Sequence, residues 1–218
     1  ESSIQNIADY LNDTAHSTYN LLESLLNWAM AEGGRFVYHP INFELKQATR
    51  IVYDVLNTLA MKKNIQLVES TPRHLKVYAD INMITSVIQN LVSNALKFTN
   101  VDGSGAVYIE AAECDQGVVI SVRDTGLGMT QQQIEGLFQP DLQVSLQGTS
   151  GEKGAGLGLV LCKRFVDLNK GQIEVVSKEG EGTTFKVTLP AATHGHQSLM
   201  QLKKNDAASA LSPLESLN

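Results

Sequence analysis

The sequence has few cysteines, no excess of positive charge and no long hydrophobic run. Its two cysteines, Cys114 and Cys162, share no short metal-binding or redox spacing, which favours two reduced core thiols in a cytoplasmic protein. No run approaches the roughly 18 apolar residues of a transmembrane helix, so we expect no membrane contact by this segment. Seventeen Lys and Arg against 23 Asp and Glu give a net charge of -6, which argues against a nucleic-acid partner held by bulk charge.

The composition is that of a folded protein with an unusual distribution of glycine. The 218 residues are 43% hydrophobic and 18% charged, which excludes a disordered chain and is enough for one large or two small domains. The sequence begins at Glu1 with neither methionine nor signal peptide, so we expect a fragment of a longer protein, in which other regions can supply a membrane anchor.

Fourteen of the 17 glycines fall between Gly103 and Gly182. Glycine lets backbone approach a ligand closely, so this clustering is the first indication of a binding site.

The first 34 residues have the pattern of one long bundle-forming helix. Apolar-leaning positions alternate at spacings of three and four, as in the seam of a coiled coil or helical bundle: Ile4, Ile7, Leu11, Thr14, Thr18, Leu21, Leu25 and Trp28. Gly33 and Gly34 then end the helix. A single helix cannot bury its own apolar stripe, so this segment requires partner helices.

The rest of the chain alternates between helical and strand patterns. One helix carries the period Leu45, Ala48, Val52, Val55 and Leu59, and a longer one has Asp80 as its N-cap and Ile84, Val87, Ile88, Leu91 and Ala95 on its apolar face. Strands are predicted at 65–68, 75–78, 107–111, 118–122, 172–176 and 184–189, and a further helix at 157–168. Beyond Pro190 the sequence is small and polar, which predicts a tail or linker.

Four motifs occur in order within this α/β context. They are NLVSNALKFT (90–99), DTGLGM (124–129), GAGLGL (154–159) and GEGTTF (180–185). Together they resemble the ATP-binding catalytic domain of sensor histidine kinases, within the gyrase, chaperone, histidine kinase and mismatch-repair ATPase superfamily. The resemblance runs from about Phe36 to Pro190 and implies an α/β two-layer sandwich, with helices on one face of a mixed β-sheet and ATP held between helices and a flexible lid.

The resemblance also divides the chain. Residues 1–34 resemble the second helix of the family's dimerisation and phosphoacceptor hairpin, 35–190 the ATP-binding catalytic domain, and 191–218 a flexible tail or linker. It implies a homodimer formed through the helical hairpin in the parent protein, and a response regulator receiver domain as partner.

The first motif carries the candidate catalytic residues Asn90, Asn94 and Lys97. Asn90 and Asn94 are four residues apart and so project from one face of a helix, and their amide oxygens suit Mg2+ that is bound mainly by phosphates and water. The resemblance assigns the Mg2+ ligand to Asn94 with Asn90 beside it, and places the Lys97 cation against the ATP phosphates. A solvated lysine remains the alternative for Lys97.

The second and fourth motifs provide the expected adenine site. Asp124 ends a strand before a glycine-rich turn, where a buried carboxylate can accept a hydrogen bond from the adenine amino group, as the family's aspartate does. Gly126 and Gly128 let the chain turn tightly against the base. Thr183 matches the family threonine that helps to bind adenine from an adjacent strand.

The third motif provides the expected triphosphate site. Gly154, Gly156, Leu157 and Gly158 lie at the start of a helix, whose terminal amides and dipole favour phosphate. The segment before it, about 141–153, is rich in Gln, Ser and Gly, as expected of the family's lid. Lys153 is at the end of the lid. A solvated side chain and a side chain that contacts phosphate are both open alternatives for it.

Asn90 distinguishes between classes of the superfamily. Its hydrolysing members carry a glutamate general base four residues before the magnesium asparagine, whereas the Asn90 amide cannot take a proton from water. This amide therefore favours a kinase over a hydrolysing ATPase. The resemblance implies that the γ-phosphate of ATP passes to a histidine outside this fragment, for relay to a response regulator aspartate, so we do not expect the fragment to autophosphorylate alone.

Two features depart from the family pattern. No histidine is followed by the acid, arginine and proline of the phosphoacceptor box, and we interpret His16 as an ordinary helix-surface or interface histidine. The family's phenylalanine box is present only in part, because Asp141 follows Leu137–Pro140 where a second aromatic residue is common. These departures leave open an alternative function, a non-catalytic nucleotide-sensing or scaffolding module that regulates a partner kinase.

Overall fold

The computed structural model describes residues 37–138, 149 and 157–192. The elements follow in chain order as β1 (Ile41–Glu44), α2 (Leu45–Lys62), β2 (Gln66–Glu69), β3 (Lys76–Ala79), α3 (Ile81–Phe98), β4 (Ala106–Cys114), β5 (Gly117–Asp124), α4 (Gln131–Gly136), α5 (Leu157–Leu168), β6 (Gln172–Lys178) and β7 (Gly182–Leu189). The helix predicted for 1–34, and the predicted tail from residue 193 onward, lie outside the described residues.

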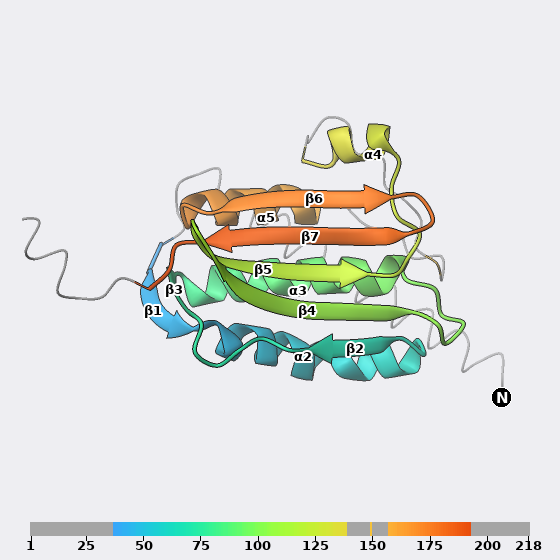
Figure 1. Cartoon of the computed structure of the whole chain (residues 1–218), viewed down its shortest axis with the longest axis horizontal. Coiled ribbons are helices and arrows are strands. Elements are labelled where there is room, and N and C mark those ends of the chain that lie inside the picture. The colour runs from blue at the N-terminus through green and yellow to red at the C-terminus, as the bar shows by residue number, and fades with distance from the viewer. Residues whose placement is uncertain (1–36, 139–148, 150–156, 193–218) are drawn as a thin grey trace, which may run out of the picture.

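The domain is built on a five-stranded mixed sheet of order β2-β4-β5-β7-β6. The β2–β4 pair is parallel and the other three pairs are antiparallel. Helices α2, α3 and α5 lie side by side behind one face of this sheet (Figure 1). The predicted fold, helices on one face of a mixed β-sheet, is therefore confirmed.

The hydrophobic core fills the space between the sheet and these three helices. Its largest fully buried side chains come from both layers, and they include Leu45, Ile84, Ile88, Leu91, Leu96, Ile109, Ile120 and Leu189. Helix α3 contributes the largest share of the buried helical side chains, because its apolar residues recur with the helical period on the face that meets the sheet. This central position fixes the helix that carries the first motif.

The predicted apolar face of α2 is wrong in its second half. Val55 and Leu59 are 57% and 39% exposed, while Leu56 and Ala60 are buried. After Val52 the helical spacing of three and four fits both Val55 with Leu59 and Leu56 with Ala60. In the structure the second pair, at i+4 and i+8 from Val52, is buried. Val55 and Leu59 therefore lie on the solvent side of α2.

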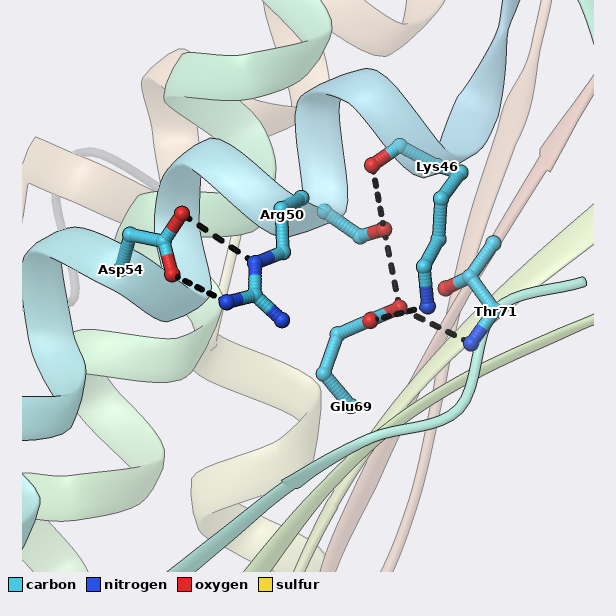
Figure 2. Close-up of polar contacts among 6 residues, drawn as sticks. Lys46, Arg50, Asp54, Glu69 and Thr71 are labelled. Atoms are coloured by element: carbon cyan, nitrogen blue, oxygen red, sulfur yellow. Dashed lines mark hydrogen bonds and ion pairs between the residues drawn. The ribbon is translucent and has the colours of Figure 1, made fainter. Parts of the chain in front are cut away.

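Helix α2 is fastened to the end of β2 by the carboxylate of Glu69 (Figure 2). Glu69 Oε2 pairs with Lys46 Nζ, and Oε1 accepts hydrogen bonds from Thr49 Oγ1 at 3.1 Å and from the Thr71 amide at 2.8 Å. The Glu69 side chain is only 2% exposed. This cluster links the first turns of α2 to the strand that forms one edge of the sheet.

A second, two-stranded antiparallel sheet is formed by β1 and β3 at one end of the domain (Figure 1). The chain leaving β7 returns to this sheet, since the Tyr78 amide donates to Pro190 O at 3.1 Å and the Ala192 amide donates to Lys76 O at 3.0 Å. Pairing thus continues two residues into the segment predicted as a tail. None of the described helices combines the length and the apolar character needed to cross a membrane.

Helix α4 was not predicted, although its start has a recognisable sequence signature. Thr130 Oγ1 accepts a hydrogen bond from the Gln133 amide at 3.3 Å, and Gln133 Oε1 accepts one from the Thr130 amide at 2.8 Å. This reciprocal capping box follows the Thr-x-x-Gln pattern. The helix is followed by Leu137 and Phe138, the described part of the phenylalanine box, which pack against the core.

Candidate functional site

Helix α3 begins where the sequence predicts, at the N-cap Asp80. The Asp80 Oδ1 atom accepts hydrogen bonds from the Asn82 amide at 3.0 Å and the Met83 amide at 3.2 Å, which satisfies two of the unpaired donors of the first turn. From this fixed start the helix runs without interruption to Phe98. It therefore holds Asn90, Asn94 and Lys97 in a defined relation to one another.

The two asparagines of α3 are in direct contact. Asn94 Nδ2 donates to Asn90 Oδ1 at 3.1 Å, and both side chains are partly exposed. This bond turns the Asn94 amide nitrogen toward Asn90 and leaves the Asn94 carbonyl oxygen to accept from, or coordinate, another group. An amide oxygen on a partly exposed helix face fits a Mg2+ ion that keeps most of its water and phosphate ligands.

The first turn of α5 lies against this asparagine pair. A Cβ atom added to Gly158 would come within 2.4 Å of Asn90 Nδ2, so only glycine allows this approach. One turn further on, Cys162 Sγ lies 3.9 Å from Val87 O, and burial raises the pKa of this thiol to about 12. The predicted phosphate-facing end of α5 is thus brought to Asn90. Leu157 begins the helix, whereas Gly154 and Gly156 lie outside the described residues.

The second cysteine does not behave as predicted. Cys162 is buried, as expected of a core thiol, but Cys114 is exposed. Cys114 is the last residue of β4 and pairs with Gly117 beside the tight β4–β5 turn, where the neighbouring Ala112 and Glu113 are exposed as well.

Asp124 is a buried carboxylate at the end of β5. Its Oδ1 atom accepts hydrogen bonds from the Gly126 amide at 2.9 Å and the Thr183 amide at 3.2 Å, and the residue is 7% exposed. Burial raises its pKa above the ordinary value, and the two amide bonds and the neighbouring Arg123 offset this only in part. Among the residues that the structure describes, none donates a hydrogen bond to Oδ2, so this oxygen can accept one from a ligand.

The turn that follows Asp124 is clamped between α3 and the β6–β7 turn. The Leu127 amide donates to Phe98 O at 3.0 Å, and the Gly180 amide donates to Leu127 O at 2.7 Å. Gly128 has φ +66, and an added Cβ would lie 1.9 Å from Lys178 O. Glycine is therefore required at position 128 by its contact with the backbone of Lys178, independently of any contact with a ligand.

Thr183 lies directly opposite Asp124 in the β5–β7 register. Its amide binds Asp124, and its Oγ1 lies 2.9 Å from Ser177 Oγ on β6. The structure thus brings together the two residues that the sequence assigned to adenine. Ser177 was missed because the strand predicted at 172–176 ended two residues before the end of β6.

Lys97 lies in the last turn of α3, with its Nζ 4.8 Å from the centre of the Phe98 ring. Its backbone carbonyl accepts hydrogen bonds from the amide of Thr149 at 3.0 Å and from the Thr149 hydroxyl at 3.1 Å. Thr149 is the only described residue of the predicted lid, and no motif in the sequence identified it. Lys153 lies outside the described residues.

The candidate site therefore has two parts joined by the C-terminal end of α3. The asparagine pair with Gly158 offers amide groups and a helix N-terminus, which suit a metal-bound phosphate. The pair Asp124 and Thr183 offers a buried acceptor with a hydroxyl beside it, which suits a flat heterocycle with an amino group. Within the described ranges, no three His, Cys, Asp or Glu side chains gather in a way that could hold a metal ion.

Comparison with known proteins identifies the family of the chain. Residues 79–193 match the family described as "Histidine kinase-, DNA gyrase B-, and HSP90-like ATPase", which is just over half of the chain. Among curated proteins, the autoinducer 2 sensor kinase/phosphatase LuxQ of Vibrio parahaemolyticus is 30% identical over 194 residues, covering 85% of this chain and 22% of LuxQ. The matched curated relatives are much longer, and the chain spans between 20% and 44% of those compared.

Solved structures give the same result. The catalytic domain of histidine kinase ThkA is 28% identical with a TM-score of 0.62, covering 71% of this chain and 97% of that domain. Full-length ShkA in complex with AMPPNP has a TM-score of 0.72 at 24% identity, over 87% of this chain and 39% of ShkA, and shows the shared fold. ThkA in complex with the response regulator TrrA shows it as well, with a TM-score of 0.64 at 21% identity, over 87% of this chain and 52% of that one. The resemblance inferred from the four motifs is confirmed.

Proposed function

Because the chain belongs to the histidine kinase-, DNA gyrase B- and HSP90-like ATPase family, we propose that it is the ATP-binding catalytic core of a two-component sensor histidine kinase. It transfers the γ-phosphate of ATP to a histidine of the parent protein that is not part of this chain, for relay to an aspartate of a response regulator receiver domain. The parent protein acts as a homodimer through its helical hairpin, with this core in the cytoplasm.

The observation that carries this proposal is the chemistry of Asn90. The residue lies one helical turn before Asn94, where the water-splitting members of the superfamily carry a glutamate. Its amide is engaged by Asn94 and is packed against Gly158, and an amide has no basic group with which to deprotonate water. The site thus keeps ATP intact until an external nucleophile arrives.

The base and the phosphates are held by separate groups. Asp124 accepts the adenine amino group on Oδ2 while the Gly126 and Thr183 amides hold Oδ1, and Gly128 shapes the turn against the base. Oriented in this way, the nucleotide directs its phosphates toward α3. Buried, preformed acceptors favour adenine over bases that lack the amino group.

The phosphates meet positive and dipolar groups. Asn94, assisted by Asn90, would hold Mg2+, which would supply neutralisation of the phosphate charge. Lys97 supplies a cation at the end of α3. The amides of Leu157 and Gly158, in the first turn of α5, bind the triphosphate together with Gly154 and Gly156, which precede them in the sequence. In-line transfer needs this positioning and charge neutralisation rather than covalent chemistry by the protein.

The test of the site is Asn94→Ala. We expect it to weaken the calorimetric affinity for Mg2+–AMPPNP by about tenfold or more, because an amide oxygen that binds the metal cannot be replaced by a methyl group. Asn82→Ala is the matched control, since Asn82 lies exposed in the first turn of the same helix and binds Asp80 only through its backbone. Unchanged binding by Asn94→Ala, with unchanged circular dichroism, would contradict the site assignment.

A labelling experiment separates the kinase from the non-catalytic module. The full-length parent protein is incubated with γ-labelled ATP and Mg2+. Acid-labile, base-stable label on the protein is expected for a histidine kinase. Nucleotide binding without label would support the sensing or scaffolding module, and steady phosphate release without label would identify a hydrolysing ATPase.

A further inference from the structure

The C-terminal end of α3 has all of its last carbonyl groups bound by other segments. A helix normally leaves four terminal carbonyls without partners. Here Leu96 O accepts from Lys63 Nζ at 3.3 Å, and Phe98 O accepts from the Leu127 amide at 3.0 Å. The remaining two, Lys97 O and Thr99 O, are both bound by Thr149.

Thr149 makes this contact with both of its polar groups. Its amide lies 3.0 Å from Lys97 O, and its hydroxyl oxygen lies 3.1 Å from Lys97 O and 2.9 Å from Thr99 O. Lys97 and Thr99 precede it by 52 and 50 residues, so the contact is tertiary and joins the glycine-rich region to the helix end. The carbonyl that is bound twice belongs to Lys97, the candidate phosphate cation.

We propose that Thr149 is a positioning residue for the nucleotide phosphates, acting through the last turn of α3 and the Lys97 side chain. The inference rests on the proposed function, in which Lys97 faces the phosphates. It adds a specific role for a residue that belongs to none of the four motifs.

The electrostatics of a helix end explain why such a residue is needed there. The C-terminus of a helix carries partial negative charge on its unpaired carbonyls, which repels phosphate oxygens. The Thr149 donors satisfy the carbonyls of Lys97 and Thr99 and hold the last turn in one geometry. The Lys97 side chain then presents its charge to phosphate from a fixed backbone, with no bare carbonyl competing for it.

Two substitutions separate the hydroxyl from the shape of the side chain. Thr149→Val keeps the branched shape and the amide bond to Lys97 O but removes both hydroxyl contacts. Thr149→Ser keeps the hydroxyl. A positioning role through the hydroxyl therefore predicts a defect in the valine variant and recovery in the serine variant.

The experiment is a double-mutant cycle on the full chain, with Mg2+–AMPPNP as the probe in calorimetry. We expect Thr149→Val to weaken the affinity by about fivefold to tenfold, as for one hydrogen-bonding group, and Thr149→Ser by less than about twofold. Because Thr149 acts through Lys97, Thr149→Val should weaken the affinity by less than about twofold more when Lys97→Ala is already present. Thermal unfolding of each variant verifies that all of them remain folded.

The outcomes distinguish this inference from the proposed site. A normal effect of Lys97→Ala with no effect of Thr149→Val overturns the positioning role and leaves the site standing. Additive losses in the double variant, or a lowered melting temperature with unchanged affinity, show a structural role only and also overturn it. No effect of Lys97→Ala removes the phosphate role of Lys97 itself, and the inference falls with it.

Discussion

The surroundings of Asp124 and Glu69 shift the pKa values of these two carboxyl groups in opposite directions. At Asp124, burial raises the pKa, and two amide donors do not fully compensate. At Glu69, burial would also raise the pKa, but the hydrogen bonds from Lys46 and from the two threonines outweigh it and lower the pKa. The difference is the ammonium group beside Glu69. Asp124 is thus a buried acceptor with capacity left for a ligand, whereas Glu69 is fully used by the fold.

Glu69→Gln should destabilise the domain in a pH-dependent way. The folded pKa of Glu69 lies below its ordinary value of 4.5, so its stabilisation is complete above that pH and is lost as the pH falls through the folded pKa. We expect the substitution to lower the free energy of unfolding by about 1–3 kcal/mol near pH 7, and by less in acid. Urea denaturation at pH 7 and below pH 4.5 measures both values.

Glu113→Gln is the control for this prediction, because Glu113 is an exposed glutamate on β4. It should change the unfolding free energy by less than about 0.5 kcal/mol at either pH. A loss for Glu69→Gln that is equally large at both pH values would contradict the assigned ion pair.

Some residues of the site could be predicted from the sequence and others could not. Asp124 and Thr183 stand in recognisable motifs, and the structure places them opposite each other in register. Thr149 stands in no motif, and its partners lie about fifty residues away. A tertiary hydrogen bond of this kind leaves no local sequence pattern, because the residues around Thr149 do not indicate a partner fifty residues away. Cys114 shows the opposite error, because the absence of metal-binding or redox spacing did not mean that this thiol is buried.

At the scale of elements, α3 is the scaffold of the candidate site. Its N-cap Asp80 was predicted from the sequence, because capping depends on residues within one turn. Its C-terminal contacts, with Leu127 and Thr149, arise from distant segments. The same contrast explains α2 and α4. The apolar pattern of α2 fitted two faces, and only packing against the sheet selected one, whereas the start of α4 carried a local signature that was overlooked.

Asp80→Ala should destabilise α3 and the segment that enters the domain. Besides capping the helix, Asp80 accepts the His39 amide on Oδ2 at 3.0 Å, and its own amide donates to Asn169 Oδ1 at 2.7 Å. Alanine removes the cap and the His39 bond together, at an expected cost of about 2–4 kcal/mol in the free energy of unfolding. Asp80→Asn keeps an oxygen acceptor and should lose less. Urea denaturation compares them.

The matched control is Asp54→Ala on α2. Asp54 is an exposed aspartate whose ion pair with Arg50 lies at the surface (Figure 2), so its loss should cost less than about 1 kcal/mol. If Asp80→Ala were no more destabilising than Asp54→Ala, Asp80 would not be the anchor that its contacts indicate.

At the scale of the whole molecule, the fold class followed from the family resemblance that the four motifs carry, but the strand order was not predicted. The strand order β2-β4-β5-β7-β6 in the sheet depends on pairings between distant segments, including one parallel pair. Local sequence patterns do not predict such pairings. The result is a domain with two distinct ends. The last residue of β5, Asp124, lies at the end of the sheet opposite to the β1–β3 pair (Figure 1).

Both boundaries of the described domain are attached at the β1–β3 end. The entering segment is bound through the His39 amide to Asp80, and the leaving segment through Pro190 and Ala192 to β3. These attachments lie away from the candidate nucleotide site. They should therefore contribute to stability without contributing to nucleotide affinity, which separates the two properties in one experiment.

We expect a segment of residues 37–192 to fold and to bind Mg2+–AMPPNP, and a segment of residues 41–189 to be less stable by about 2–4 kcal/mol. The shorter segment lacks three hydrogen bonds, each worth about 1 kcal/mol net, and the packing of Tyr38 against the core. Urea denaturation measures the stability difference, and calorimetry under conditions where both segments are folded should give affinities within about twofold of each other. Equal stabilities would contradict the structural role of these attachments. A large loss of affinity in the folded shorter segment would instead show that the β1–β3 end is coupled to the nucleotide site, against the separation that the architecture indicates.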